Sequence, residues 1–140
     1  METPVSSPCQ VIATHVPDSE RLAFLPRYFR AWMLIVENAI YCHLRELSPD
    51  YHGGLWDYFA LSNGGCYLAP QGATFRLEQP NNGFQGTVSA DAAGIISTLY
   101  ALSHLSFEHE SKTIFAQRFH ELREFALEHA EASLIFRAID

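Results

Sequence analysis

FALSNGGCYLAP occupies residues 59–70, and its centre, Asn63-Gly64-Gly65, stands between two apolar runs. A type I′ turn requires positive φ at both of its central residues, and Asn-Gly adopts that conformation at little steric cost. The stretch therefore predicts a β-hairpin, and with it a sheet in the middle of the chain. Aromatic residues on both sides of the turn leave open that the same surface also contacts a partner.

Turn signals continue beyond this hairpin. Between residues 53 and 89 they separate four short runs, with further turns at Pro70-Gln71-Gly72 and at the stretch PNNG, residues 80–83. Phe75 and Leu77 alternate with polar neighbours, as in a strand that has one face in water. We expect a four-stranded antiparallel β-meander.

Helical patterns precede the meander. A short helix is expected to begin at Asp18, which resembles a helix cap, and to be limited by Pro26. Apolar residues then recur at helical spacing from Arg27 to Leu47, which predicts one amphipathic helix that ends before Ser48-Pro49.

Helical patterns also follow the meander. Ser89 is expected to cap a third helix, in whose first turn Asp91 complements the helix dipole. Gly94 inside this helix costs about 1 kcal/mol relative to Ala, which indicates close packing against a neighbour. A fourth helix is expected from Ser111, and a short final one near Glu131 to Ile139.

These elements together predict one α+β domain over residues 18–140, with a four-stranded antiparallel meander flanked by four to five α-helices. Residues 1–17 contain three prolines and no sustained apolar period, so they are expected to form an extended N-terminal arm.

Composition and charge narrow the class of protein. The chain has 140 residues, 48% of them hydrophobic, and a formal net charge of −7. The three cysteines and the absence of a signal-peptide pattern favour the cytoplasm, and the longest apolar run is about a third of a membrane span. The negative charge argues against strong direct DNA binding. The 16 acidic residues are spread thinly along the chain, unlike the dense track that a DNA mimic needs.

Residue types that carry chemistry are present without the spacing that the chemistry requires. The seven histidines form no HExxH pair and no CxxC occurs, so no metal site is predicted. Cys42 and His43 are adjacent, and neighbouring helical residues point in different directions. The glycine-rich turns lack the order of a phosphate-binding loop, and the only lysine is Lys112. We predict no catalytic residue and no cofactor.

Five aromatic residues gather around the predicted hairpin: Tyr51, Trp56, Tyr58, Phe59 and Tyr67. Aromatic side chains with a polar group are enriched at protein interfaces. Packing of the sheet against helices is the favoured interpretation for Trp56 and Phe59. Tyr58 and Tyr67 are the better candidates for exposure and for contact with a partner.

Four stretches carry a family resemblance. They are VPDSERLAFLPRYF (16–29), YHGGLWDYFALSNGGCYLAP (51–70), NGFQGTVSADAAGIISTLYALSHL (82–105) and FRAID (136–140). They cover nearly the whole chain in the family's order, and on these residues the sequence resembles the ArdB/KlcA antirestriction proteins.

The resemblance implies a small intracellular protein, typically encoded on plasmids or other mobile elements, that protects incoming DNA from Type I restriction enzymes of the host. It implies a block of DNA cleavage and supplies no catalytic residue or cofactor. The residues that match the family pattern lie in the hairpin and where the last strand meets the third helix: Asn63, Gly64, Gly65, Tyr67, Ser89, Asp91 and Gly94. The candidate interaction residues are Tyr58, Asn63, Gly64, Gly65, Tyr67 and Asp91.

The leading hypothesis is therefore a noncatalytic antirestriction protein that contacts the Type I restriction complex or a host factor that it needs. Two alternatives stay open: a general protein-interaction module in plasmid maintenance, and a small hydrolase with a pocket at the hairpin. An exposed aromatic edge is compatible with a homodimer, and the sequence fits a monomer equally well.

Overall fold

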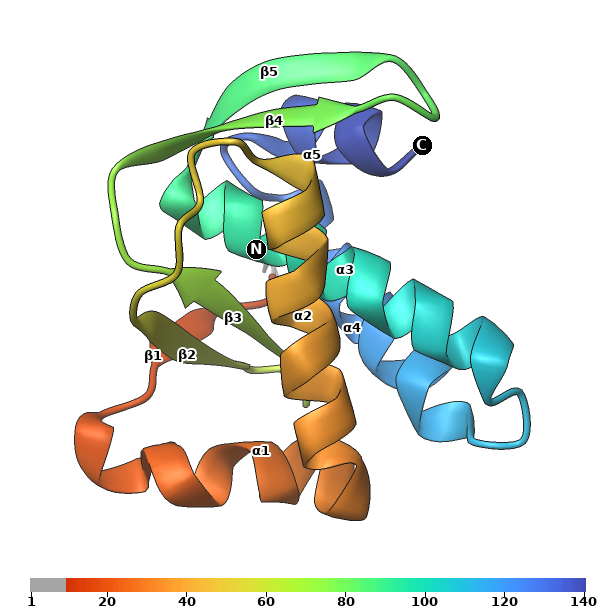
Figure 1. Cartoon of the computed structure of the whole chain (residues 1–140). Coiled ribbons are helices and arrows are strands. Elements are labelled where there is room, and N and C mark those ends of the chain that lie inside the picture. Colours follow the sequence, from red (N-terminus) through yellow and green to blue (C-terminus); the bar gives the residue numbers. More distant parts are fainter. Residues whose placement is uncertain (1–9) are drawn as a thin grey trace, which may run out of the picture.

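Helix α3 (Ala90–Glu108) runs through the middle of the fold in the computed structural model, which describes residues 10–140 (Figure 1). Within these residues the other α-helices and the strands are α1 (Arg21–Phe29), α2 (Met33–Leu47), α4 (Thr113–Leu127), α5 (Ala132–Ile139), β1 (Ala13–His15), β2 (Trp56–Leu61), β3 (Cys66–Pro70), β4 (Thr74–Gln79) and β5 (Phe84–Ser89). The predicted α+β class is confirmed.

The central place of α3 follows from its sequence. Apolar residues cover the helix almost all round, and such a helix is stable only where other elements surround it. Ile95, Ile96, Leu99 and Leu102 are all fully buried. The helix packs against β3, against helices α2, α4 and α5, and against the β4–β5 hairpin.

The four predicted strands all form, but they make two sheets instead of one continuous meander. β2 and β3 pair in the predicted hairpin, with Phe59 opposite Tyr67. β1 joins the outer edge of β2, so the first sheet has the order β1-β2-β3. β4 and β5 form a separate antiparallel pair, with Arg76 opposite Thr87. The single meander was therefore a wrong expectation, and its physical cause is that α3 occupies the edge of β3.

Two residues of α3 allow a helix to lie along that strand edge. Tyr58 is opposite Leu68, and its carbonyl accepts a hydrogen bond from Val16 on the β1 side, so the Leu68 backbone groups point away from β2. The Thr98 hydroxyl oxygen accepts from Leu68 N at 3.4 Å, and the hydroxyl lies 3.5 Å from Leu68 O as a donor. One turn earlier, a Cβ on Gly94 would clash with the Leu68 carbonyl oxygen and the next residue of β3. The predicted close packing at Gly94 is confirmed.

The first two helices differ from prediction in where the chain bends. Pro26 lies inside α1, which continues to Phe29. The bend comes instead at Arg30, whose φ of 52° and ψ of −126° end α1. A short 3₁₀ turn, η3 (Arg30–Trp32), then leads into α2. The single helix expected from Arg27 to Leu47 is therefore divided.

The first residues of helices α3, α4 and α5, which follow the sheets in the chain, agree better with expectation. Ser89 caps α3 through a hydrogen bond from Ala92 N to its Oγ, at 3.1 Å. α4 begins at Thr113, two residues after Ser111, and α5 covers nearly the predicted range. Before the sheets, the expected cap at Asp18 is wrong, because Asp18 begins a 3₁₀ turn, η2 (Asp18–Glu20), and neither this turn nor α1 has a side-chain cap.

Part of the expected N-terminal arm, residues 1–9, lies outside the described residues, and Ala13–His15 within it pairs as β1. No helix in the described part of the chain is long and apolar enough to cross a membrane.

Candidate functional site: the docked hairpin and the start of helix α3

The turn between β2 and β3 has a different geometry from the predicted type I′. Gly64 has a φ of 97°, whereas Asn63 has a negative φ. Gly64 N donates to Leu61 O at 3.0 Å, and Leu61 N donates to Gly65 O at 2.9 Å. These bonds are those of a three-residue hairpin loop with glycine at its left-handed position. The positive φ thus falls on one residue, and only Gly64 needs glycine for that reason.

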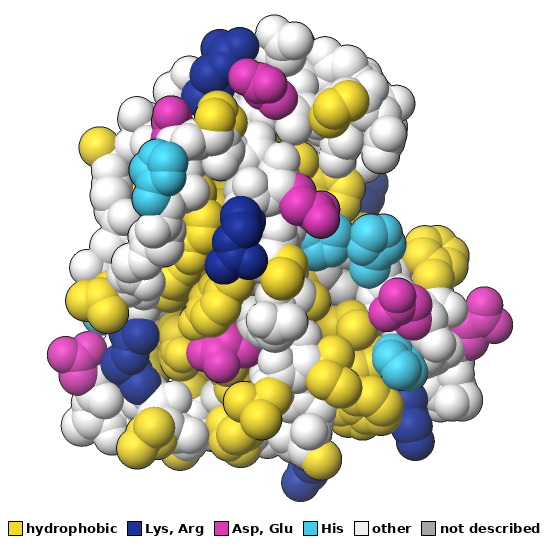
Figure 2. Space-filling view, viewed as in Figure 1, with side chains coloured by type: hydrophobic (Ala, Val, Ile, Leu, Met, Phe, Trp, Pro, Cys, Tyr) yellow, Lys and Arg dark blue, Asp and Glu magenta, His cyan; other side chains and the backbone are white. Residues whose placement is uncertain are grey.

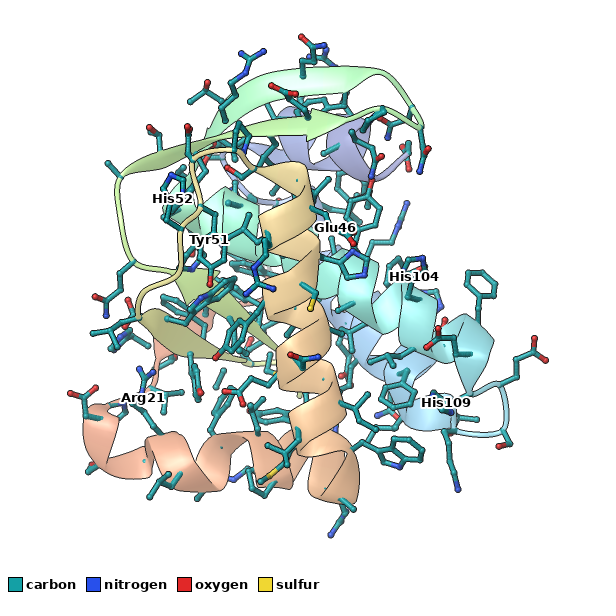
Figure 3. The ribbon with its side chains drawn as sticks, in the orientation of Figure 1. Arg21, Glu46, Tyr51, His52, His104 and His109 are labelled. Carbon is teal, nitrogen blue, oxygen red and sulfur yellow. The ribbon has the colours of Figure 1, made fainter. Side chains whose placement is uncertain are left out.

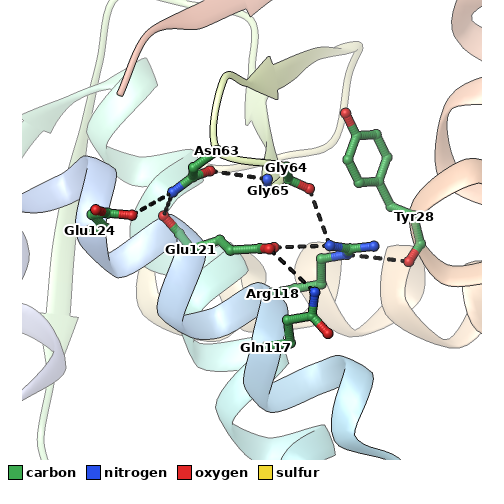
Figure 4. Close-up of polar contacts among 8 residues, drawn as sticks. All are labelled: Tyr28, Asn63, Gly64, Gly65, Gln117, Arg118, Glu121 and Glu124. Carbon is green, nitrogen blue, oxygen red and sulfur yellow. Dashed lines mark hydrogen bonds and ion pairs between the residues drawn. The ribbon is translucent and has the colours of Figure 1, made fainter. Parts of the chain in front are cut away.

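The Asn63 side chain fastens the turn to α4 (Figure 4). Its Nδ2 donates to Glu121 O and to Glu124 Oε1, each at 2.9 Å, and its Oδ1 accepts from Gly65 N at 3.1 Å. Gly65 is buried, and a Cβ there would lie 2.8 Å from the Glu121 Cβ. The turn therefore has the shape and hydrogen bonds that direct contact with α4 requires.

Arg118 completes this contact and extends it to α1. Its Nη1 donates to Gly64 O at 3.1 Å and to Glu121 Oε1 at 2.9 Å. Its Nε donates to Tyr28 O at 3.4 Å, and the guanidinium lies 5.4 Å from the Tyr28 ring centroid. The Arg118 and Glu121 side chains are both largely shielded from water, so their ion pair is less screened than a surface pair.

Tyr67 lies beneath the hairpin and is only 1% exposed, which contradicts its predicted exposure. Its ring stacks on Phe59 and on Phe125 of α4, with centroids 4.8 and 5.7 Å away. Its hydroxyl donates to Asp91 Oδ1 at 2.6 Å. Burial, followed by the contact with Asp91, raises the pKa of Tyr67, so this hydroxyl remains a donor at neutral pH.

Asp91 links Tyr67 to the loop between α4 and α5. His129 Nε2 lies 2.7 Å from Asp91 Oδ2, and His129 Nδ1 accepts from Glu131 N at 2.9 Å. Because Nδ1 is an acceptor, the neutral ring carries its proton on Nε2 and donates it to Asp91. Burial by itself raises the pKa of Asp91, but the hydrogen bonds from His129 and Tyr67 outweigh it and bring the pKa below its ordinary value.

Ser89 and Glu131 close the network at the start of α3. The Ser89 hydroxyl donates to Glu131 Oε2, Ser89 N donates to Glu131 Oε1, and Ser89 Oγ accepts the capping bond from Ala92. A serine, a histidine and two carboxylates are thus close together. Both nitrogens of His129 already hold partners, so neither can take a proton from a serine without losing a hydrogen bond. The arrangement joins three chain segments and resembles a scaffold more than a nucleophile with its base.

Tyr58 lies on the opposite face of β2 and is separated from the other candidates. It is 8% exposed, so its predicted exposure is also wrong. Its hydroxyl donates to Glu37 Oε2 at 3.0 Å, and Arg21 lies over its ring at 4.4 Å from the centroid. Trp56 is buried as expected, and Phe59 is partly buried.

Five of the six candidates therefore come together, and two of them are accessible at their side chains. Gly64 is exposed backbone, Asn63 is partly exposed, and the Asp91 side chain is 39% exposed. Asp91 also lines an open hollow of about 210 Å³ with Asp57 and Phe59. Asn63 and Gly64 reach solvent at the turn beside Glu124, whereas Asp91 faces the other end of the β2–β3 hairpin, where Ala69 and Pro70 line the same hollow. We call these accessible residues, Asn63, Gly64, Asp91 and Glu124, the hairpin surface.

Sequence reasoning missed the α4 side of the site. Arg118, Glu121, Phe125 and His129 meet the hairpin and α3, and their spacing of three or four residues puts them along one side of α4 and its end. Three of these four residues are polar, and nothing in the neighbouring sequence identifies the distant partners of a polar side chain.

Comparison with known proteins agrees with this architecture. The profile of a family described as "Antirestriction protein" matches residues 49–140. An Escherichia coli protein named "Antirestriction protein KlcA" is 44% identical over 145 residues, covering 99% of both chains. A second Escherichia coli protein of the same name is 44% identical over 135 residues, covering 93% of this chain and 95% of the other.

One solved structure covers 100% of both chains with a TM-score of 0.86 and 43% identity. It comes from work on the KlcA and ArdB proteins, which are described as having a novel fold and antirestriction activity against Type I DNA restriction systems in vivo but not in vitro.

Proposed function

The chain belongs to the antirestriction protein family, and we propose on that premise that it protects DNA from cleavage by Type I restriction-modification systems in the cell. The observation that carries the proposal is similarity over the full length in both sequence and fold. A match confined to the hairpin would carry no such weight, since a turn with Asn and Gly occurs in many unrelated sheets.

The protein acts without catalysis in this proposal. The network of Ser89, Asp91, His129 and Glu131 supports it, because each of these side chains is engaged in a hydrogen bond that holds the fold. A catalytic serine would need a free base beside it. Support of the junction between β5 and α3 is therefore a sufficient role for these four residues.

The partner is proposed to be a protein: the Type I restriction complex or a host factor associated with it. Imitation of DNA fits the charge poorly, because several acidic side chains are committed to internal contacts. Glu37 accepts from two tyrosines, Glu121 pairs with Arg118, and Glu131 holds Ser89. Activity of the KlcA and ArdB proteins in vivo but not in vitro favours a route that needs a further component of the cell.

The hairpin surface is the proposed contact region. Asn63 and Gly64 reach solvent beside Glu124, and Asp91 reaches it at the other end of the hairpin. The buried residues Gly65 and Tyr67 fix the position of that surface. Tyr58 contributes to stability on the other face of β2.

Plating of unmodified phage on a Type I restricting host tests the function. Cells that carry the protein are expected to plate phage nearly as well as a nonrestricting host. Restriction that stays complete, with soluble folded protein present, would overturn the proposed function.

Two isosteric changes test the contact region separately. Glu124→Gln keeps an oxygen that can accept from Asn63 and removes the charge, and Glu78→Gln on β4 is the matched control at a half-exposed position. The first is expected to reduce protection and the second to retain it. Equal protection by both variants would refute the contact region and leave the antirestriction function in place.

A further inference from the structure

A second polar site lies between α2, α3 and the β4–β5 turn, on a different part of the molecule from the hairpin surface. Here the structure has an open cleft of about 280 Å³. Its lining includes two imidazoles and two carboxylates, from His43, Glu46, Glu78 and His104. Figure 3 labels Glu46 on α2 and His104 on α3, and Figure 2 shows two adjacent histidine side chains beside an acidic one on this face.

The two histidines face each other through their ring nitrogens. His43 Nε2 and His104 Nδ1 are 3.1 Å apart, although the residues are 61 positions apart in the sequence. The His43 ring is stacked on Tyr100 at a centroid distance of 5.6 Å and an angle of 13°. Tyr100 is held in turn by hydrogen bonds to Gln79 and to Ala138 O. The His43 ring is therefore oriented by a fixed neighbour, and its nitrogen points at the other imidazole.

The separation of the nitrogens equals the distance between two ligands on one metal ion. Zinc binds imidazole nitrogen at about 2.0–2.1 Å. Two nitrogens 3.1 Å apart could both hold an ion at that distance, with an angle of about 95° at the metal. This angle lies between those of octahedral and tetrahedral coordination. The two nitrogens face each other in the structure, so both rings have to rotate until their lone pairs point at the ion.

The surrounding groups suit such an ion. Glu46 follows His43 by three residues, which places both on one side of α2, and both line the cleft. His104 is exposed, so an ion can enter from solvent.

We propose that His43 and His104 form a binding site for a divalent transition-metal ion of the Zn²⁺ class, with Glu46 as a third ligand after rotation of its side chain. In the described residues no group of three or more His, Cys, Asp or Glu side chains has metal-binding geometry as it stands. The two histidines already have the separation of ligands on one ion, and water would fill the coordination positions that Glu46 does not. Imidazole ligands favour Zn²⁺, Ni²⁺ and Cu²⁺, whereas Mg²⁺ and Ca²⁺ prefer all-oxygen sites. This site is independent of the antirestriction function.

Titration of the untagged full-length protein with Zn²⁺ tests the site, by calorimetry and by NMR of the imidazole nitrogens. One equivalent is expected to bind and to shift His43 Nε2 and His104 Nδ1 before any other histidine nitrogen. Mg²⁺ at the same concentration is expected to shift neither. The NMR readout needs no substitution, so it does not depend on the folding of a variant.

Variants test which side chains hold the ion. His104→Gln is expected to weaken Zn²⁺ binding by about tenfold or more, and Glu46→Gln by a smaller factor. His120→Gln is the matched control, because His120 is an exposed histidine on α4 outside the cleft. Equal weakening by His104→Gln and His120→Gln, or first shifts at other histidines, would overturn the proposal, as would the absence of Zn²⁺ binding.

Discussion

Replacement of Gly94 with alanine tests the close approach of α3 to β3. The new Cβ would lie 2.6 Å from the Ala69 Cβ and would also overlap the Leu68 carbonyl oxygen. Non-bonded carbon atoms pack at about 3.5–4.0 Å, so helix and strand must separate by about 1 Å. The obstacles are backbone and a methyl group, not the end of a flexible side chain, so the whole helix has to move.

Three contributions determine how much Gly94→Ala changes the free energy of unfolding. Overpacking of a tight core costs about 1–3 kcal/mol, and a displacement of this size belongs at the upper end. The same movement breaks the long hydrogen bonds between Thr98 and Leu68, at about 1 kcal/mol. Alanine restores about 1 kcal/mol of helix propensity. The free energy of unfolding should therefore fall by about 3 kcal/mol, which lowers Tm by about 10 °C in a chain of this length.

Thermal unfolding followed by circular dichroism measures this loss, with Ser97→Ala as the control. Ser97 is buried in the same helix, and its hydroxyl has no hydrogen-bond partner among the described residues. Its replacement should leave stability unchanged or raise it by about 1 kcal/mol. A Gly94→Ala protein that melts at or above the wild-type temperature would refute the close approach. A similar loss in both variants would indicate that α3 tolerates no change at all.

Three further substitutions test other contacts. Arg30→Gly removes a side chain from a backbone with φ of 52° and should stabilise the protein by about 1 kcal/mol; a lower urea midpoint would contradict this. Asn63→Ala removes the hydrogen bonds to α4 and should cost about 2 kcal/mol; an unchanged midpoint would mean that apolar contacts alone hold the hairpin. The pKa of Asp91 is lowered in the folded state, so its contribution to stability is present above its ordinary value of 3.8 and is lost as pH falls below it. The stability difference between wild type and Asp91→Asn should therefore shrink from about pH 7 to about pH 3, and a difference independent of pH would refute the role of the carboxylate.

Local signals in the sequence were sufficient for one helix cap and for one long-range contact. Ser89 precedes an apolar helix and has no competing role, so its cap could be predicted and is present. Gly94 stands in a helix where alanine would be favoured, which pointed to a neighbour without naming it. The structure supplies the neighbour, the Leu68–Ala69 backbone.

Local sequence signals did not predict which strands pair or where the chain bends between α1 and α2. Alternation identifies β3 and β4 as strands, but it carries no information about whether they pair with each other. β1 has three residues and pairs with a strand more than 40 residues later, too short a run for a periodic signal. Pro26 was taken as the helix limit, whereas α1 tolerates it and bends at Arg30, a residue type with no turn preference.

The sequence predicted which residues of the candidate site lie together, but it predicted their exposure to solvent only in part. Asn63, Gly64, Gly65, Tyr67 and Asp91 do lie together, but the predicted exposure of Tyr67 was wrong because α4 covers it. The partners of the hairpin on α4 are more than 50 positions away in the sequence. Contacts at that separation depend on helix packing, which composition and periodicity do not specify.

The placement of α3 on the β3 edge also matters while the protein is being made. All five residues of β3 are buried in the finished fold, yet α3 is synthesised after β3 and leaves the Leu68 backbone groups open until it docks. An uncovered apolar strand edge recruits strands from other chains. Gly94 and Thr98 are the residues through which α3 closes this edge in the folded protein, so variants that weaken the docking leave it open more often. Substitutions at these two residues are therefore expected to lower the yield of soluble protein in cells.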